Sequence, residues 1–116
     1  MSPVKDAADG LVAALGAVDR LKVYTDPAAT VTPPGVVLGP PSLAWEAYCT
    51  APSSARFLVY VVEKGDARAL ERLWDLVPLV AEAVDSVAGA AVVRADPGSW
   101  GTPELPAYII EVEYGL

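Results

Sequence analysis

The sequence predicts a single small α+β domain, residues 1–116, in which a mixed, largely antiparallel β-sheet packs with two α-helices. Three observations support this fold class. The chain is 53% hydrophobic over 116 residues, which suffices for one core. An apolar strand precedes a long amphipathic helix in the second half. In the first half, prolines recur between residues 26 and 52, which excludes helix and leaves room only for short strands.

The N-terminal segment reads as a helix over residues 3 to 18. Ser2 is a suitable N-cap, and Pro3 occupies the first helical position, where its missing N–H costs nothing. Apolar residues follow at spacings of three and four, which indicates one buried stripe. The alternating run at residues 21 to 25 predicts the first strand.

The proline-rich segment predicts two short strands, at residues 36 to 38 and 43 to 48. Residues 25 to 35 before them form a long, proline-bounded loop or a splayed hairpin that no core explains. Long loops in compact domains are usually functional or disordered, so this segment is a candidate contact site.

The most strongly predicted strand covers residues 56 to 63, with apolar side chains at both alternating sets of positions. This pattern predicts a central strand covered on both faces. Gly65 and Asp66 then break the strand and cap a helix. Its expected buried stripe consists of Leu70, Leu73, Trp74, Val77, Ala81, Val84 and Val87.

The C-terminal part is expected to hold a short strand at residues 90 to 94, a turn started by residues 96 to 98, and a flexible loop through residue 103. Pro106 introduces the last strand. Alternation there predicts two faces, one apolar with Tyr108, Ile110, Val112 and Tyr114, and one wetter with Ile109, Glu111 and Glu113.

Charge and cysteine usage limit the partners. Eight basic residues against fifteen acidic ones give a net charge of −7, which disfavours binding to phosphate backbones and to anionic membranes. Cys49 is the single cysteine, so no intrachain disulfide is expected. The N-terminus does not read as a signal peptide, and no apolar run is long enough to span a membrane. We therefore expect a soluble protein made in a reducing cytoplasm.

Catalytic and metal-binding residues are sparse. The chain has no histidine, so Cys49 lacks an activating base and is expected to act as a small hydrophobic residue. Glu111 and Glu113 lie two residues apart on one strand face, as a general acid and base would. The simpler interpretation is a solvated strand face, because the sequence indicates no nucleophile or cation partner for them. We expect no enzyme activity, no cofactor and no metal site.

The three tryptophans have different expected environments. Trp74 belongs to the core by its helical position, and Trp45 is also assigned to the core. Trp100 lies in a loop of glycine, serine and proline, where it either contacts a partner or folds back onto its own domain.

The order of elements resembles that of the tail terminator proteins of long-tailed (siphovirus-type) bacteriophages, over nearly the whole chain. The matching features are an N-terminal helix, LKVY at residues 21 to 24, PPGVVLG at residues 33 to 39, FLVYVV at residues 57 to 62, an amphipathic helix, and YIIEV at residues 108 to 112. This family has no catalytic signature to match.

The resemblance implies a homo-oligomeric ring, typically of six copies, at the head-proximal end of the tail tube. Such a ring stops tube polymerisation and docks to the head. Its partners are other copies of itself, the tail tube protein and the head–tail connector protein, while DNA passes through the channel without specific binding. The location is the virion neck, reached from the host cytoplasm during assembly. The candidate interface residues are Asp26, Thr30, Val31, Thr32, Pro33, Asp96, Ser99, Trp100, Glu111 and Glu113.

Two alternatives stay open. One is another neck component, such as a head–tail connector or head-completion protein, which would also assemble as a ring but with a different partner. The other is a small ligand-binding or regulatory α+β domain, for which Arg56, Arg94 and the tyrosines are the polar candidates.

Overall fold

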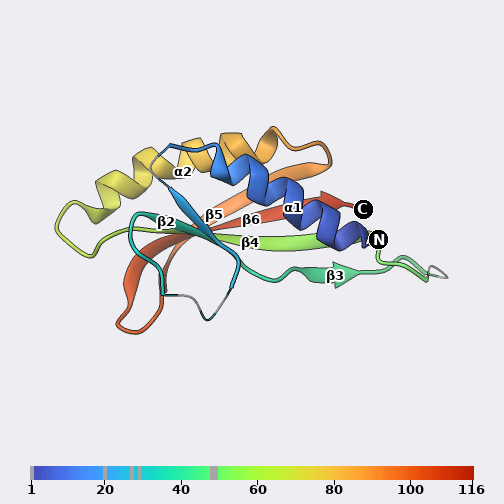
Figure 1. Ribbon diagram of the computed structural model, residues 1–116, viewed down its shortest axis with the longest axis horizontal. Helices are drawn as coiled ribbons and strands as arrows, with labels where there is room; N and C mark the ends of the chain where they lie inside the picture. The colour runs from blue at the N-terminus through green and yellow to red at the C-terminus, as the bar shows by residue number, and fades with distance from the viewer. Residues whose placement is uncertain (1, 20, 27, 29, 48–49) are drawn as a thin grey trace.

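The protein has an α+β fold, described here by a computed structural model covering residues 2–19, 21–26, 28, 30–47 and 50–116. Its elements are α1 (Pro3–Gly16), β1 (Lys22–Tyr24), β2 (Gly35–Leu38), β3 (Ser42–Ala44), β4 (Ser54–Val62), α2 (Ala69–Asp85), β5 (Ala90–Trp100) and β6 (Leu105–Gly115). Both helices lie on the same side of a single mixed sheet (Figure 1). The predicted fold class is therefore confirmed.

The sheet has the order β1-β2-β4-β6-β5, and β3 pairs with β4 beside β2. β1 and β2 are parallel, and the remaining pairs are antiparallel. β4 is the central strand, since β2 pairs with its second half, β3 with its first half, and β6 with its whole length. The antiparallel strand β6 separates β4 from β5, so the β4–α2–β5 connection skips one strand.

The main core lies between the helices and one face of the sheet. Phe57, Val59 and Val61 of β4 point into it and are fully buried, together with Ile110 and Val112 of β6. The helices contribute Leu11, Leu15, Leu73, Val80 and Val84. At α1, the side chain of Ser2 accepts a hydrogen bond from the backbone N–H of Lys5 (3.2 Å), as expected of an N-cap.

The long segment before β2 is a crossover and not a hairpin. Because β1 and β2 are parallel, with Lys22 opposite Gly35, the chain must return across the sheet before it enters β2. On the way it buries Val31 against Val37 and Val62, on the face without helices. We call residues 25–34 the crossover loop.

β5 is longer than expected, and the turn lies elsewhere. Asp96, Pro97 and Gly98 continue the strand, which pairs with β6 as far as Trp100, and the turn occupies residues 101 to 104. β5 is the edge strand, where a proline without an N–H is tolerated. The predicted turn at residues 96 to 98 and the predicted loop at Ser99 and Trp100 were therefore wrong.

The helix α2 is rotated relative to the predicted stripe. Its buried positions are Ala69, Leu73, Val80 and Val84, whereas Leu70 is 50% and Trp74 57% exposed. Two overlapping stripes of apolar residues run along this helix, and packing selects one of them. The assignment of Trp74 to the core was wrong; its indole N–H donates a hydrogen bond to the hydroxyl of Tyr108 (2.9 Å).

β3 forms a short arm at one end of the molecule. All three of its residues are exposed, and it pairs only with residues 54–56 of β4. The predicted strand at residues 43 to 48 is thus limited to Ser42–Ala44 within the described residues, which omit Tyr48 and Cys49. Trp45 follows the strand and is 55% exposed, so its assignment to the core was also wrong. We call residues 42–47 the arm.

Candidate interaction surface on the helix-free face

The face of the sheet without helices gathers most of the candidate interface residues. Alternation along β4 places Arg56, Leu58, Tyr60 and Val62 on this face, opposite the residues that meet the helices. Leu58 is 37% exposed, so the expectation that both faces of β4 are fully covered was wrong. We call this surface the open face. It divides into a charged half and an apolar half.

The charged half carries a ladder of ion pairs, of which two join β4 to β6 and one lies within β5. Arg56 of β4 contacts Glu111 at 3.0 Å and Glu113 at 2.8 Å, both on β6. On β5, Arg94 contacts Asp96 at 2.8 Å. The hydrogen bond to Glu113 and the charge of Glu111 raise the pKa of Arg56. These glutamates thus have a cation partner, contrary to the sequence interpretation. Arg56 lies far from them in the chain, but the register places it directly opposite Glu113 and two positions from the partner of Glu111.

The apolar half lies under the crossover loop. Val31, Val37, Val62 and Ala107 form a second buried cluster there, with Tyr24, Tyr60, Trp100 and Leu105 packed against it. The ring of Trp100 lies 4.8 Å from that of Tyr60, centroid to centroid. Of the two environments expected for Trp100, folding back onto its own domain therefore applies, with its side chain only partly buried.

A groove of about 470 Å³ opens between the crossover loop and the β5–β6 turn. Its walls are Ala28, Thr30 and Val31 on one side, and Trp100, Gly101, Thr102, Pro103 and Leu105 on the other. In Figure 1 these two segments lie side by side, on the side of the sheet away from the helices. The groove carries no charged side chain among its lining residues.

One hydrogen bond holds the crossover loop in place. The backbone N–H of Thr32 donates to the hydroxyl of Tyr24 (3.1 Å), and this bond lowers the pKa of Tyr24. Asp26 is exposed and accepts a hydrogen bond from the N–H of Ala28 (2.9 Å). The loop thus has a defined path over the sheet at these residues.

The structure brings the candidate residues together in two groups. Thr30, Val31 and Trp100 line the groove, and Asp96, Glu111 and Glu113 belong to the charged half. Asp26, Thr32 and Pro33 lie on the crossover loop, and Ser99 is exposed on β5 next to Trp100. Val31 is almost fully buried, so it anchors the loop and presents little surface to a partner.

Two exposed surfaces escaped the sequence reasoning. One is the outer side of α2 at Leu70 and Trp74, and the other is the arm with Leu43 and Trp45. The signal for the first was present as a second apolar stripe on α2. The signal for the arm was its position among prolines, where a tryptophan has few neighbours to pack against.

The beginning of α2 is held by ion pairs. Arg72 contacts Asp66 at 2.8 Å and the buried Glu63 at 3.4 Å, and Asp66 also accepts a hydrogen bond from the N–H of Arg68 (2.9 Å). The hydrogen bond from Arg72 is the main reason that the pKa of Asp66 is lowered. Asp66 therefore caps the turn that precedes α2, while the helix N-cap, Arg68, makes no side-chain cap.

The described residues contain neither a metal-binding cluster nor an orphaned buried side-chain polar group. No cluster of three or more His, Cys, Asp or Glu side chains there has a geometry that could hold a metal ion. Every buried side-chain nitrogen or oxygen in the described ranges has a hydrogen-bond partner. Cys49 lies outside these residues. The described part of the chain holds no helix long and apolar enough to cross a membrane.

No model of a known protein family matches this chain, and neither does any curated protein.

Proposed function

We propose that this chain is a tail terminator protein of a long-tailed bacteriophage. Copies of it form a ring at the head-proximal end of the tail tube, end the polymerisation of the tube, and present the surface to which the head docks. Its place is then the neck of the virion, with assembly in the host cytoplasm. The chain acts as a structural protein and not as an enzyme.

The observation that carries the proposal is the gathering of separate segments on the open face. The ladder and the groove come from the crossover loop, β4, β5 and β6, which are far apart in the chain. Leu58 leaves apolar surface exposed between them. A sheet face with exposed apolar side chains and a polar rim has the character of a protein contact surface. We assign this face to the tail tube protein.

The edges of the sheet favour a ring joined through side chains. Pro97 in β5 has no N–H to offer, the pairing of β5 with β6 is irregular between Val92 and Arg94, and the N–H of Val92 already donates to Asp85 (3.1 Å). Such features prevent a further strand from pairing along an edge. The opposite edge strand, β1, has only three residues. The net charge of −7 also suits a channel through which DNA passes without binding.

The test is to add the purified chain to polymerising tail tube protein encoded by the same virus, and to image the tubes by negative stain. We expect sixfold rings, and tubes that are capped at one end and shorter than in the chain's absence. Leu58→Glu should form rings but fail to cap tubes. Leu79→Glu, at a 52% exposed position on α2 away from the open face, is the matched control. Tubes of unchanged length would contradict the proposal.

The same images separate the neighbouring function. Twelvefold rings that do not bind tube ends would favour a head–tail connector. A ligand-binding domain is less well supported, because Arg56 and Arg94 are engaged with carboxylates and do not line the groove. Stabilisation of the chain against heat by a small molecule would be the sign of that function.

A further inference from the structure

We propose that the arm of one copy binds the outer side of α2 at Leu70 and Trp74 in the next copy. This head-to-tail contact would join neighbouring copies in the proposed ring, so the inference rests on the proposed function. Two different surfaces must meet in such a ring, because a patch that pairs with itself closes a dimer.

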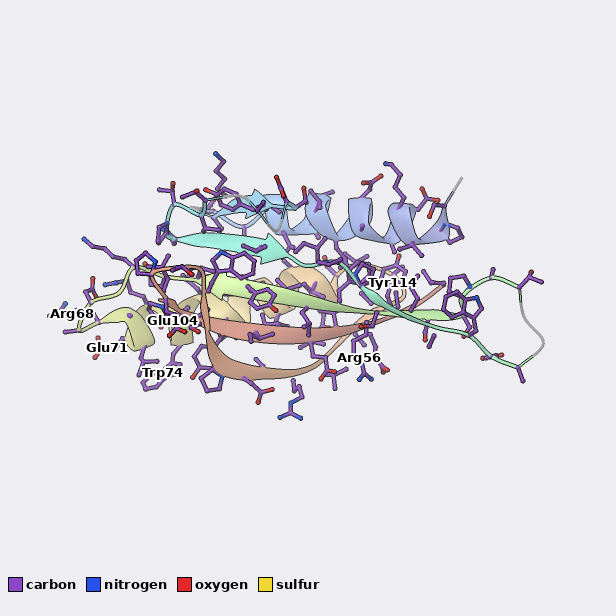
Figure 2. All side chains as sticks on the ribbon, turned by 90° about the horizontal axis from the view of Figure 1, so that it is seen from below. Arg56, Arg68, Glu71, Trp74, Glu104 and Tyr114 are labelled. Carbon is purple, nitrogen blue, oxygen red and sulfur yellow. The ribbon has the colours of Figure 1, made fainter. Side chains whose placement is uncertain are left out.

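The two surfaces lie at opposite ends of the protein. β3 pairs with the beginning of β4, at residues 54–56, whereas Trp74 bonds to Tyr108, which lies opposite Val61 near the end of β4. The molecule is 51 Å long and only 27 × 22 Å across. Figure 1 shows the arm and the start of α2 at the two ends of the long axis, and Figure 2 shows Arg68, Glu71 and Trp74 gathered at the α2 end. Contacts at the two ends link copies in series.

Each surface exposes large apolar side chains that its own chain leaves uncovered. On α2, Leu70 and Trp74 are one helical turn apart and are both half exposed or more. On the arm, Leu43 and Trp45 are exposed, and the arm uses only one side of its backbone to pair with β4. Exposed tryptophan is typical of the anchor residues of protein interfaces.

Charge selects the arm as the occupant of the α2 surface. Among the described residues, the basic side chains without an ion pair are Lys22, Lys64 and Arg68. Lys64 and Arg68 lie N-terminal to Leu70, whereas the acidic Glu71 and Asp75 directly follow Leu70 and Trp74. The arm carries one charge, the acidic Glu46 beside Trp45. An arm that lies on Leu70 and Trp74 with Glu46 toward the N-terminal end of α2 therefore brings Glu46 near Arg68, at the opposite end of this surface from Asp75. Opposite charges at such a contact favour the correct partner and orientation.

The competing arrangements bring like charges together. Two arms facing each other would oppose their Glu46 residues. Leu79 is the other exposed apolar residue of α2, but the hollow beside it is rimmed by Asp19 and Asp75, which would repel the arm. Like charges held close at an interface are costly.

The experiment breaks the two surfaces separately and follows self-association of the whole chain by sedimentation velocity. Trp45→Ala removes the arm anchor. Leu70→Glu disrupts the α2 surface and leaves the Trp74–Tyr108 hydrogen bond untouched. We expect each to weaken self-association at least about tenfold, whereas Leu79→Glu leaves it unchanged. Circular dichroism checks that each variant is folded.

Mixing the two variants gives the decisive result. Trp45→Ala retains an intact α2 surface, and Leu70→Glu retains an intact arm. An equimolar mixture of the two should therefore form dimers and nothing larger. A charge exchange sharpens the test: Glu46→Arg and Arg68→Glu should each weaken assembly, and the two together in one chain should restore it. A mixture that stays monomeric, or a wild-type chain that is monomeric at every concentration, would overturn the contact.

The outcomes keep this contact distinct from the terminator proposal. Rings that persist in Trp45→Ala and still cap tubes would overturn the contact and leave the proposed function standing. If the two variants form mixed dimers but the wild-type chain has no effect on tube length, the contact is supported and the terminator proposal is overturned.

Discussion

The two faces of the sheet differ in what their side chains do, although they alternate along the same strands. On β4, Phe57, Val59 and Val61 are fully buried under the helices, while the neighbouring Leu58 remains exposed and Tyr60 is only partly covered. The helix face therefore supplies the stable core. On the open face, the crossover loop and the β5–β6 turn cover only the apolar half, and a ladder of charges and a groove remain at the surface. Adjacent residues of one strand thus lie in turn in the core and on the exposed surface.

The largest expected effect breaks the core on the helix face. Phe57→Ala removes a fully buried ring that packs edge-on against Tyr114, 6.5 Å away, and should lower the free energy of unfolding by about 3 to 5 kcal/mol. Leu58→Ala, the next residue along, should change it by less than about 1 kcal/mol, because Leu58 is already partly in water. Urea unfolding measures both. Equal losses would mean that the two faces contribute alike.

A smaller effect is expected on the open face at Trp100. Trp100→Ala removes a partly buried ring and its contact with Tyr60, so we expect a loss of about 1 to 3 kcal/mol, below that of a fully buried aromatic. The helices should stay folded, as judged by far-ultraviolet circular dichroism. Trp45→Ala is the matched control and should cost less than about 0.5 kcal/mol. Complete unfolding of Trp100→Ala would show that the second cluster is part of the main core.

The attachment of the crossover loop gives the third prediction. A Cβ atom added at Gly35 would lie 2.9 Å from Cγ1 of Val31 and 3.1 Å from Cε2 of Tyr24, so Gly35→Ala must displace the loop. We expect a loss of about 1 to 3 kcal/mol and faster hydrogen exchange at the N–H of Thr32. Gly16→Ala has open space at the end of α1 and should be neutral or stabilising by up to about 1 kcal/mol. Unchanged exchange at Thr32 would contradict the packing described for the loop.

The smallest expected effect is a pH dependence at the start of α2. The pKa of Asp66 is lower in the folded chain than in the unfolded one, chiefly through its hydrogen bond with Arg72. The stabilisation is therefore present above the unfolded value of about 3.9 and is lost as the pH falls through the folded value. Asp66→Asn should be less stable than wild type at pH 7, and the difference should vanish in acid. Arg72→Met should reduce this difference, which acid titrations of the unfolding temperature measure.

The sequence reasoning was most successful where one local rule determined the structure. The start of α1 at Ser2-Pro3 and the strand β4 followed from capping and periodicity, and both are confirmed. It failed where long-range packing decides. The rotation of α2 depends on which of two stripes meets the sheet, and the turn signal of Asp96-Pro97-Gly98 was overridden by pairing with β6.

The same limit applies to the candidate surface. Composition and loop length identified the crossover loop and Trp100, and the fold unites Thr30, Val31 and Trp100 in one groove. The pairing of Arg56 with Glu111 and Glu113 depends on the register of two strands more than fifty residues apart, which no local pattern encodes. The exposure of Trp45 and Trp74 likewise depends on where the helices and the arm end.

The position of β6 also bears on how the protein is made. This strand is the last element of the sequence, yet it lies between β4 and β5 and bonds to both along nearly its full length. While the chain is being synthesised, residues 54–62 and 90–100 leave the ribosome before the strand that joins them. Until residues 105–115 emerge, two long strands have unpaired edges, and such edges are where a partly made chain is most exposed to aggregation.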